Sequence, residues 1–288
     1  MNTSISIDRR RFLRSGLLGS AALAGTLLTP ETDAAVTKPA RDPWDGLKVG
    51  ITTYTLRNFS LDQAITMTKA AGVKYISLKD VHLPLNSTPA QRREAAQKIA
   101  AAGLVLMGGG VIYMNNQEPE VRNAFEYAKD TGMPTIICSP EPEALDLVER
   151  LAVQYNLRIA IHNHGPGDKR YPSPLDVLRL VKDRNPLMGL CLDVGHTVRL
   201  GEDPIAAIHR CADRLYDFHM KDEKAATART SPVPVGRGVI DIVGVLKALA
   251  EKRYAYDVAL EYEAHPEDPM PGMIESYAYM RGVLATFG

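Results

Sequence analysis

Short apolar runs alternate with longer segments of helical periodicity along most of this chain, and the alternation restricts the folds it can adopt. Apolar runs bounded by turn residues indicate buried strands, and apolar positions repeating every three to four residues indicate helices. The expected strands cover residues 47–54, 73–79, 104–112, 134–139, 157–163, 188–194, 215–221 and 256–263. Eight strand–helix units in about 240 residues predict a single-domain α/β fold, a (β/α)8 TIM barrel, over residues 47–288.

An open, doubly wound sheet would alternate in the same way. No GxGxxG motif follows the first expected strand, which disfavours dinucleotide binding. The glycines at 108–110 interrupt the third strand without a phosphate-loop lysine, and we interpret them as a place where backbone and substrate approach closely. Helix boundaries are also marked: Ser60 is the expected N-cap of one helix that ends before Gly72, and Thr88 precedes Pro89 at the start of the next.

The N-terminal region differs from the rest of the chain. Residues 1–36 resemble a twin-arginine signal peptide, with Arg9 and Arg10 ahead of an apolar stretch at 17–28. That stretch is shorter than the about 20 residues of a membrane span, so a membrane anchor is the less favoured alternative. Residues 37–46, rich in Pro and charge, are the expected linker. The signal predicts a periplasmic or otherwise exported protein that meets a membrane only through this segment.

Charge and cysteine content exclude several classes of protein. The formal net charge is zero, which disfavours nucleic-acid binding. Cys138, Cys191 and Cys211 are odd in number and widely spaced, so neither a disulfide framework nor a CxxC metal site is expected. Cys138 and Cys191 lie within apolar runs and are expected to be buried thiols.

Histidines and carboxylates gather at the ends of the last four expected strands. Chemistry in a TIM barrel takes place at this carboxyl end, where side chains from neighbouring strands converge. A mixed nitrogen and oxygen donor set favours one divalent metal ion such as Mn, Co, Zn, Fe or Mg, whereas buried ion pairing alone remains the alternative. The residues are His162, His164, Asp193, His196, His219, Lys221, Glu261 and Glu263.

Four segments carry a resemblance to a known family. "CLDVGH" (191–196), "FHMKD" (218–222), "PVGRGVID" (234–241) and "LEYE" (260–263) resemble the xylose isomerase-like barrels, and the likeness covers residues 47–287. That superfamily includes sugar isomerases, ketose 3-epimerases, inosose dehydratase and endonuclease IV. The resemblance implies a metal-dependent enzyme that acts on a small carbohydrate.

The resemblance also implies a ligand set with one departure. Asp193, His219 and Glu261 match family metal ligands, and His162 stands where the epimerases have a glutamate. Those epimerases use two glutamates as bases on opposite faces of the sugar. Because a neutral, metal-bound imidazole is not a second base, the sequence favours proton abstraction by Glu261 next to a carbonyl, followed by isomerisation or elimination.

The remaining polar residues have expected roles around this centre. Lys221 would stabilise negative charge on the substrate. His164 would either contact the substrate or support His162. The resemblance further implies that His196 contacts a substrate hydroxyl and that Arg237 belongs to the motif that closes over the site. Lys79 and His82 lie at the end of the second strand and are expected to bind substrate, with a solvated polar loop as the alternative. The expected catalytic residues are therefore Glu261, Lys221 and His162, and the expected substrate-binding residues are His164, His196, Arg237, Lys79 and His82.

Three functions remain open at this level. The first is a sugar isomerase or epimerase-like enzyme. The second is a periplasmic 3-keto-glycoside lyase or dehydratase, acting after a partner sugar oxidoreductase has oxidised C3. The third is a non-catalytic sugar-binding barrel, which would not need a metal. DNA cleavage of the endonuclease IV kind is disfavoured by the neutral charge and the export signal. The sequence leaves a homo-oligomer open.

Overall fold

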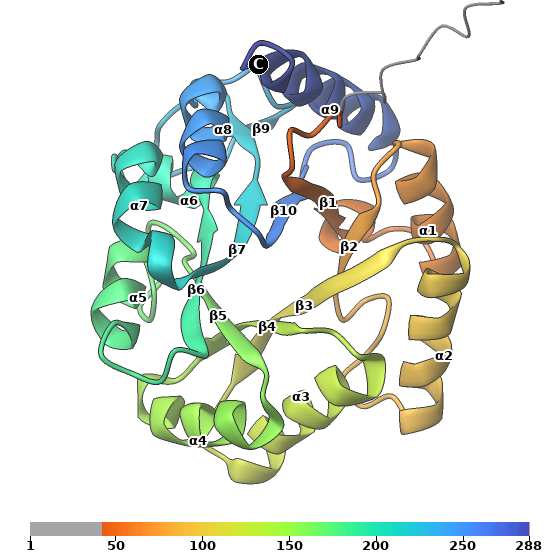
Figure 1. Cartoon of the computed structure of the whole chain (residues 1–288), viewed down its shortest axis with the longest axis vertical. Helices are drawn as coiled ribbons and strands as arrows, with labels where there is room; N and C mark the ends of the chain where they lie inside the picture. Colours follow the sequence, from red (N-terminus) through yellow and green to blue (C-terminus); the bar gives the residue numbers. More distant parts are fainter. Residues whose placement is uncertain (1–41, 288) are drawn as a thin grey trace, which may run out of the picture. The chain divides into compact units, whose positions relative to one another are not determined.

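Eight parallel strands close into a barrel in the computed structural model, which describes residues 42–287 (Figure 1). Neighbours around the barrel follow the order β1–β10–β7–β6–β5–β4–β3–β2. The predicted barrel fold is therefore confirmed, and the open sheet is excluded. The strands are β1 (Lys48–Thr52), β2 (Tyr75–Leu78), β3 (Val105–Met114), β4 (Thr135–Pro140), β5 (Arg158–His162), β6 (Met188–Asp193), β7 (Leu215–Met220) and β10 (Asp257–Leu260).

Helices surround the strands on the outside of the barrel (Figure 1). They are α1 (Leu61–Ala70), α2 (Pro89–Ala101), α3 (Glu118–Thr131), α4 (Leu145–Tyr155), α5 (Pro174–Val181), α6 (Val194–Arg199), α7 (Pro204–Cys211), α8 (Ile242–Glu251) and α9 (Met270–Leu284). Short 3-10 turns lie at Thr53–Leu56, Pro142–Ala144 and Ala212–Arg214. After β7 the chain forms a small antiparallel pair, β8 (Asp222–Glu223) and β9 (Pro232–Val233).

The helix-start signals in the sequence have the expected structural effect. Ser60 caps α1 in a capping box with Gln63, and Gly72 beyond the other end has a positive φ of 75°. Thr88 caps α2 in the same manner, with Pro89 as the first helical residue. Each cap satisfies backbone N–H groups that the first helical turn leaves without partners.

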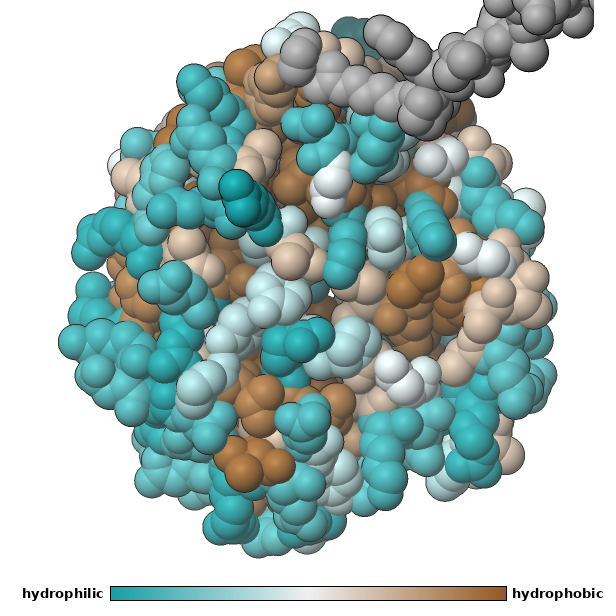
Figure 2. Space-filling model, in the orientation of Figure 1, coloured by the Kyte–Doolittle hydropathy of each residue, from teal (hydrophilic) through white to brown (hydrophobic). Residues whose placement is uncertain are grey.

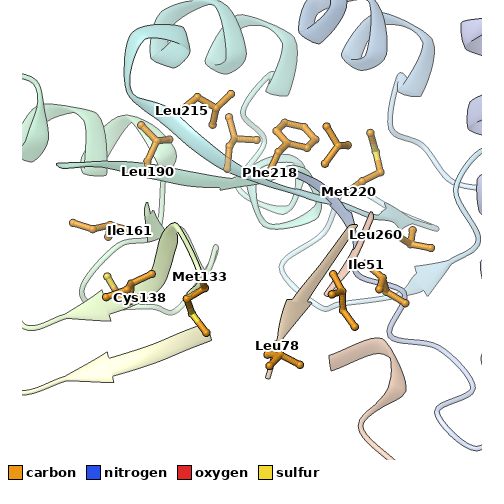
Figure 3. Packing of buried hydrophobic residues seen from close by; sticks show 14 of the residues in the cluster. Ile51, Leu78, Met133, Cys138, Ile161, Leu190, Leu215, Phe218, Met220 and Leu260 are labelled. Atoms are coloured by element: carbon orange, nitrogen blue, oxygen red, sulfur yellow. The ribbon is translucent and has the colours of Figure 1, made fainter. Parts of the chain in front are cut away.

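The main core lies between the barrel wall and the helices. Phe218 on β7 is fully buried in this cluster together with Leu190 and Leu215 (Figure 3). Burying one such side chain contributes about 1.5–3 kcal/mol relative to leaving it exposed. The face of the molecule seen in Figure 2 carries mostly hydrophilic side chains, as expected where amphipathic helices turn their polar side outward.

The glycine run on β3 packs closely against β4, and Gly110 also lines a cavity. A Cβ at Gly108 would lie 2.7 Å from Cδ1 of Ile137 on β4, and one at Gly110 would overlap the Ile137 carbonyl oxygen. The space that these side chains would need is therefore filled by the neighbouring strand. Close packing of β3 on β4 therefore accounts for these two glycines, and their approach to a substrate stays a prediction.

All three cysteines are buried and free, as predicted for Cys138 and Cys191. Burial raises the pKa of each thiol, that of Cys211 to about 12. Because the thiolate is the reactive form, these residues behave as small apolar side chains.

The predicted signal peptide, residues 1–36, lies outside the described residues. Residues 42–46, the last part of the predicted linker, form turns in which Trp44 is buried. Its ring meets Tyr277 edge-on at 6.0 Å between centroids and lies under the Arg281 guanidinium at 5.2 Å. Within residues 42–287 no helix has the length and apolar character needed to cross a membrane.

Candidate metal centre

Four consecutive strands of the barrel deliver one donor side chain each. His162 and Asp193 are the last residues of β5 and β6, His219 is the next-to-last residue of β7, and Glu261 directly follows β10. Asp193 pairs in register with His219, and these strands lie side by side in the barrel wall. One ligand atom of each residue lies within 4.8 Å of all the others. The structure thus brings together all four ligands predicted from the sequence.

The separations between donor atoms suit a single metal ion. Nε2 of His162 lies 3.0 Å from Nδ1 of His219 and 3.5 Å from Oδ2 of Asp193. Nδ1 of His219 lies 3.3 Å from Oε2 of Glu261. Donors about 2.0–2.2 Å from one ion lie roughly 3–4 Å from one another. The two nitrogens and two oxygens therefore converge at the spacing that a divalent ion requires.

The ionisation of the two histidines depends on their neighbours. Burial holds the pKa of His162 well below its ordinary value, so its imidazole is neutral and available as a ligand. Burial acts in the same direction on His219, but the carboxylates of Glu261, Asp217 and Asp193 outweigh it and raise its pKa to about 9. A proton on His219 thus occupies the position of positive charge that a metal ion would take.

Lys221 lies beside the donor cluster, with its ammonium among three carboxylates. Nζ is 2.9 Å from Oδ2 of Asp193, 2.8 Å from Oε2 of Glu261 and 2.6 Å from Oε1 of Glu263. Burial lowers the pKa of Lys221, but the carboxylates hold it well above its ordinary value. With His219 neutral, as a metal ligand is, three carboxylates and one ammonium leave a net charge of minus two, which one divalent cation would neutralise.

Asp217 is a buried residue near the donor cluster that was not predicted from the sequence. Its Oδ1 lies 3.5 Å from Nε2 of His219, on the opposite side of the ring from the donor cluster, and it accepts a hydrogen bond from Sγ of Cys191. A carboxylate behind a ligand histidine orients the ring and directs the other nitrogen to the metal. The signal was present in the sequence, because Asp217 lies two residues before His219 and alternation places both on one face.

A cavity of about 260 Å³ opens above the donor cluster. Among the predicted substrate-binding residues, Lys79, His164 and His196 line it. Val111 and Tyr113 of β3 also line it, and neither was predicted from the sequence. The complete lining is Tyr54, Lys79, Val111, Tyr113, His162, His164, His196, Glu261 and Glu263.

Two histidines and a tyrosine form part of the wall of this cavity. The Tyr113 hydroxyl lies 3.3 Å from Nε2 of His164, and the two rings stack at 5.8 Å between centroids. Nδ1 of His196 lies 3.0 Å from a guanidinium nitrogen of Arg199. Burial lowers the pKa of His196 to about 4, so this ring is neutral and can hydrogen-bond a substrate hydroxyl.

The structure does not bring His82 and Arg237 to the cavity. His82 is buried beside the barrel, with Nε2 3.2 Å from the carbonyl oxygen of Leu56. The Arg237 side chain is 65% exposed and pairs with Glu275. In the motif around Arg237 it is the backbone that is held, because the Asp222 carboxylate accepts hydrogen bonds from the amides at 236, 238 and 240. Both side chains therefore contact other parts of the fold and not the donor cluster.

Comparison with known proteins places these features in a wider group. Inosose dehydratase from Clostridium botulinum is 28% identical over 155 residues, which are 48% of this chain and 51% of that protein. Inosose dehydratase from Lacticaseibacillus casei is 25% identical over 206 residues, 65% of this chain and 68% of that protein. The chain thus spans about half to two thirds of the length of these curated relatives.

Solved structures share the fold. L-ribulose 3-epimerase has a TM-score of 0.69 at 17% identity, over 83% of this chain and 95% of that one. The apo form of 3-keto-D-glucoside 4-epimerase from E. coli has a TM-score of 0.69 at 15% identity, over 82% and 99%. The family model described as "Xylose isomerase-like TIM barrel" matches residues 65–283, which contain all four donors. This chain therefore belongs to the xylose isomerase-like TIM barrel family.

Proposed function

We propose that this protein is a divalent-metal-dependent enzyme that removes a proton next to the carbonyl of a keto-sugar or keto-polyol. The observation that carries the proposal is the position of Glu261, which belongs to the four-donor cluster and also lines the cavity above it. The family of sugar isomerases, epimerases and dehydratases supports the substrate class. A binding protein without catalysis would need neither this cluster nor a buried ammonium beside it.

His162, Asp193, His219 and Glu261 would hold the metal ion. The donor set fits, since it offers two imidazole nitrogens and two carboxylate oxygens with a net charge that a divalent cation balances. Such an ion supplies a Lewis acid that makes the C–H beside a carbonyl more acidic. Asp217 keeps the His219 ring turned so that Nδ1 faces the other donors.

Glu261 is the base in this proposal. Burial raises the pKa of its carboxyl, but Lys221 and His219 outweigh burial and hold the pKa well below its usual range. The group is therefore ionised, which is the form that accepts a proton. Oε2 contacts His219 and Lys221, so we assign proton transfer to the other carboxylate oxygen, Oε1. The Lys221 ammonium stabilises the negative charge that develops on the substrate oxygen.

The proton can then follow one of two routes. Returning it to the adjacent carbon isomerises the sugar. Alternatively, a leaving group on the neighbouring carbon departs with its bonding electrons as a carbon–carbon double bond forms. We favour elimination, because His162 replaces a carboxylate that a two-base epimerase would use, and because the curated relatives carry the name dehydratase. In that case Glu261 keeps the proton until it passes to the leaving group or to water.

Lys79, His164 and His196 would position the substrate by hydrogen bonds to its hydroxyl groups. Because Nδ1 of the neutral His196 ring accepts from Arg199, that ring offers its Nε2–H as a donor, and the Lys79 ammonium offers further donors. Tyr113 adds an aromatic face at the mouth. A small carbohydrate fits this mixture of polar groups and one aromatic wall.

We also propose that the chain is exported through its twin-arginine segment and acts outside the cytoplasm. The motive is the arginine pair ahead of a weak apolar stretch. Mass spectrometry of the protein from the envelope fraction should show an N-terminus near residue 35. An intact Met1 on exported protein would contradict cleavage, and retention in the cytoplasm would contradict export.

Metal binding should stabilise the fold through the donor cluster. Adding Mn²⁺ or Co²⁺ to metal-stripped protein should raise the free energy of unfolding by about 2.7 kcal/mol at a hundredfold excess over Kd, measured as a rise in Tm. Asp193→Asn should abolish most of the rise while keeping the side-chain oxygen that caps α6. The exposed Asp183→Asn is the matched control. Equal Tm shifts in all three proteins would show that the ion binds elsewhere.

Glu261→Gln should keep the shape of the site and remove the base. General acid–base catalysis is typically worth about 10²–10⁴-fold, so kcat should fall by at least that factor. Metal content must be measured in parallel, because Glu261 is also a proposed ligand. Glu267→Gln, on the same loop and exposed, is the matched control and should leave kcat unchanged. A metal-replete Glu261→Gln enzyme with near-normal turnover would contradict the assignment of the base.

A further inference from the structure

A second cavity of about 180 Å³ adjoins the one above the donor cluster. The two cavities share Val111 and Tyr113 of β3 as lining residues. The second one extends away from the metal ligands, between the end of β2, the loop that follows it and α3. Ligand pockets usually measure about 300–1,000 Å³. Either cavity alone is smaller than this range, whereas the two together reach it.

The second cavity has a specific chemistry. Leu78, Leu85 and Ile112 give it an apolar wall, and the ring of Tyr127 forms part of its lining. The Tyr127 hydroxyl is already used, because it donates to the Leu83 carbonyl at 3.0 Å. Tyr127 therefore offers its ring rather than its hydroxyl to an occupant.

Tyr113 stands between the two cavities. Its side chain is 61% exposed, and its hydroxyl is held beside His164 in the first cavity. This contact orients the ring at the boundary, where it can pack against an occupant of either cavity. An aromatic face of this kind packs well against the C–H face of a sugar ring.

An ion pair spans the same boundary. Lys79 lines the first cavity and Asp80 the second, and Nζ of Lys79 lies 3.0 Å from Oδ1 of Asp80. Nζ also donates to the Val111 carbonyl at 3.4 Å. The junction thus presents an ammonium on one side and a carboxylate that accepts from hydroxyl groups on the other.

We propose that the second cavity is a subsite for a second sugar ring, so that the preferred substrate is a keto-glycoside of two sugar residues. The inference rests on the proposed function, in which the first ring presents its C–H to Glu261. A sugar ring has an apolar face for the leucines and tyrosines and hydroxyl donors for Asp80. The Asp80 carboxylate disfavours a phosphate group, and a purely apolar group would use none of the acceptor capacity that the Lys79 ion pair leaves on that carboxylate.

The test compares ligands that share the reacting ring. Metal-loaded protein is titrated by calorimetry with a 3-keto-glucoside of glucose, with methyl 3-keto-glucoside and with phenyl 3-keto-glucoside. The two-sugar ligand should bind at least about tenfold more tightly than the methyl glycoside. Equal affinities for these two would overturn the subsite. Binding of the phenyl glycoside as tight as that of the two-sugar ligand would overturn its assignment to a sugar.

Two variants test whether the difference in affinity arises in the second cavity. Leu85→Trp should fill the second cavity and abolish the difference in affinity between the two-sugar and methyl ligands. Asp80→Leu removes the carboxylate at a position 54% exposed, where folding is little affected, and should reduce the same difference severalfold. Val153→Trp on the exposed side of α4 is the control. A full affinity difference in both Leu85→Trp and Asp80→Leu would contradict the proposal.

Turnover is recorded separately with the same ligands. Because affinity reports on the subsite without catalysis, tight two-sugar binding with no reaction would count against the proposed function and leave the subsite supported. Turnover of all three ligands with equal affinities would support the proposed function and overturn the subsite.

Discussion

The candidate site depends on one buried ammonium and the carboxylates that it holds together. Removing a charge from water costs several kcal/mol unless partners compensate it, and Lys221 is compensated by Asp193, Glu261 and Glu263. The same contacts keep Glu261 ionised. Even with these contacts the cluster has more negative than positive charge. Protonation of His219 supplies part of the missing positive charge, and a bound divalent ion would supply it instead. Charge balance thus links the proposed base, the four donor residues and the expected metal ion in one arrangement.

The barrel makes this arrangement possible through the parallel alignment of its strands. Carboxyl ends of neighbouring parallel strands meet at one rim, so single residues far apart in the sequence become close neighbours there. His162 and Glu261 are separated by most of the second half of the chain, yet both contact His219. The hydrophobic core between strands and helices supplies the stability that a cluster of buried charges does not.

Much of the fold and the donor set could be predicted from the sequence, because alternation and strand-end residues are local signals. Val111 and Tyr113 could not, because the register of β3 against β4 shifts between Gly109 and Ile112 and simple alternation fails there. Arg237 could be placed in a loop by resemblance, but the direction of its side chain depends on Glu275, which is distant in sequence. His82 likewise follows a strand end in the sequence, but its ring contacts the Leu56 carbonyl and does not line the cavity.

The most direct test of the account is hydrogen exchange at the substrate carbon. Metal-loaded protein is incubated with a 3-keto-glucoside in D2O, and the C–H groups are followed by NMR. The account predicts that deuterium enters the substrate or product at a carbon next to the carbonyl, and that this exchange is lost in metal-replete Glu261→Gln. Product formation without any cleavage of that C–H bond, or exchange that persists in the variant, would contradict it.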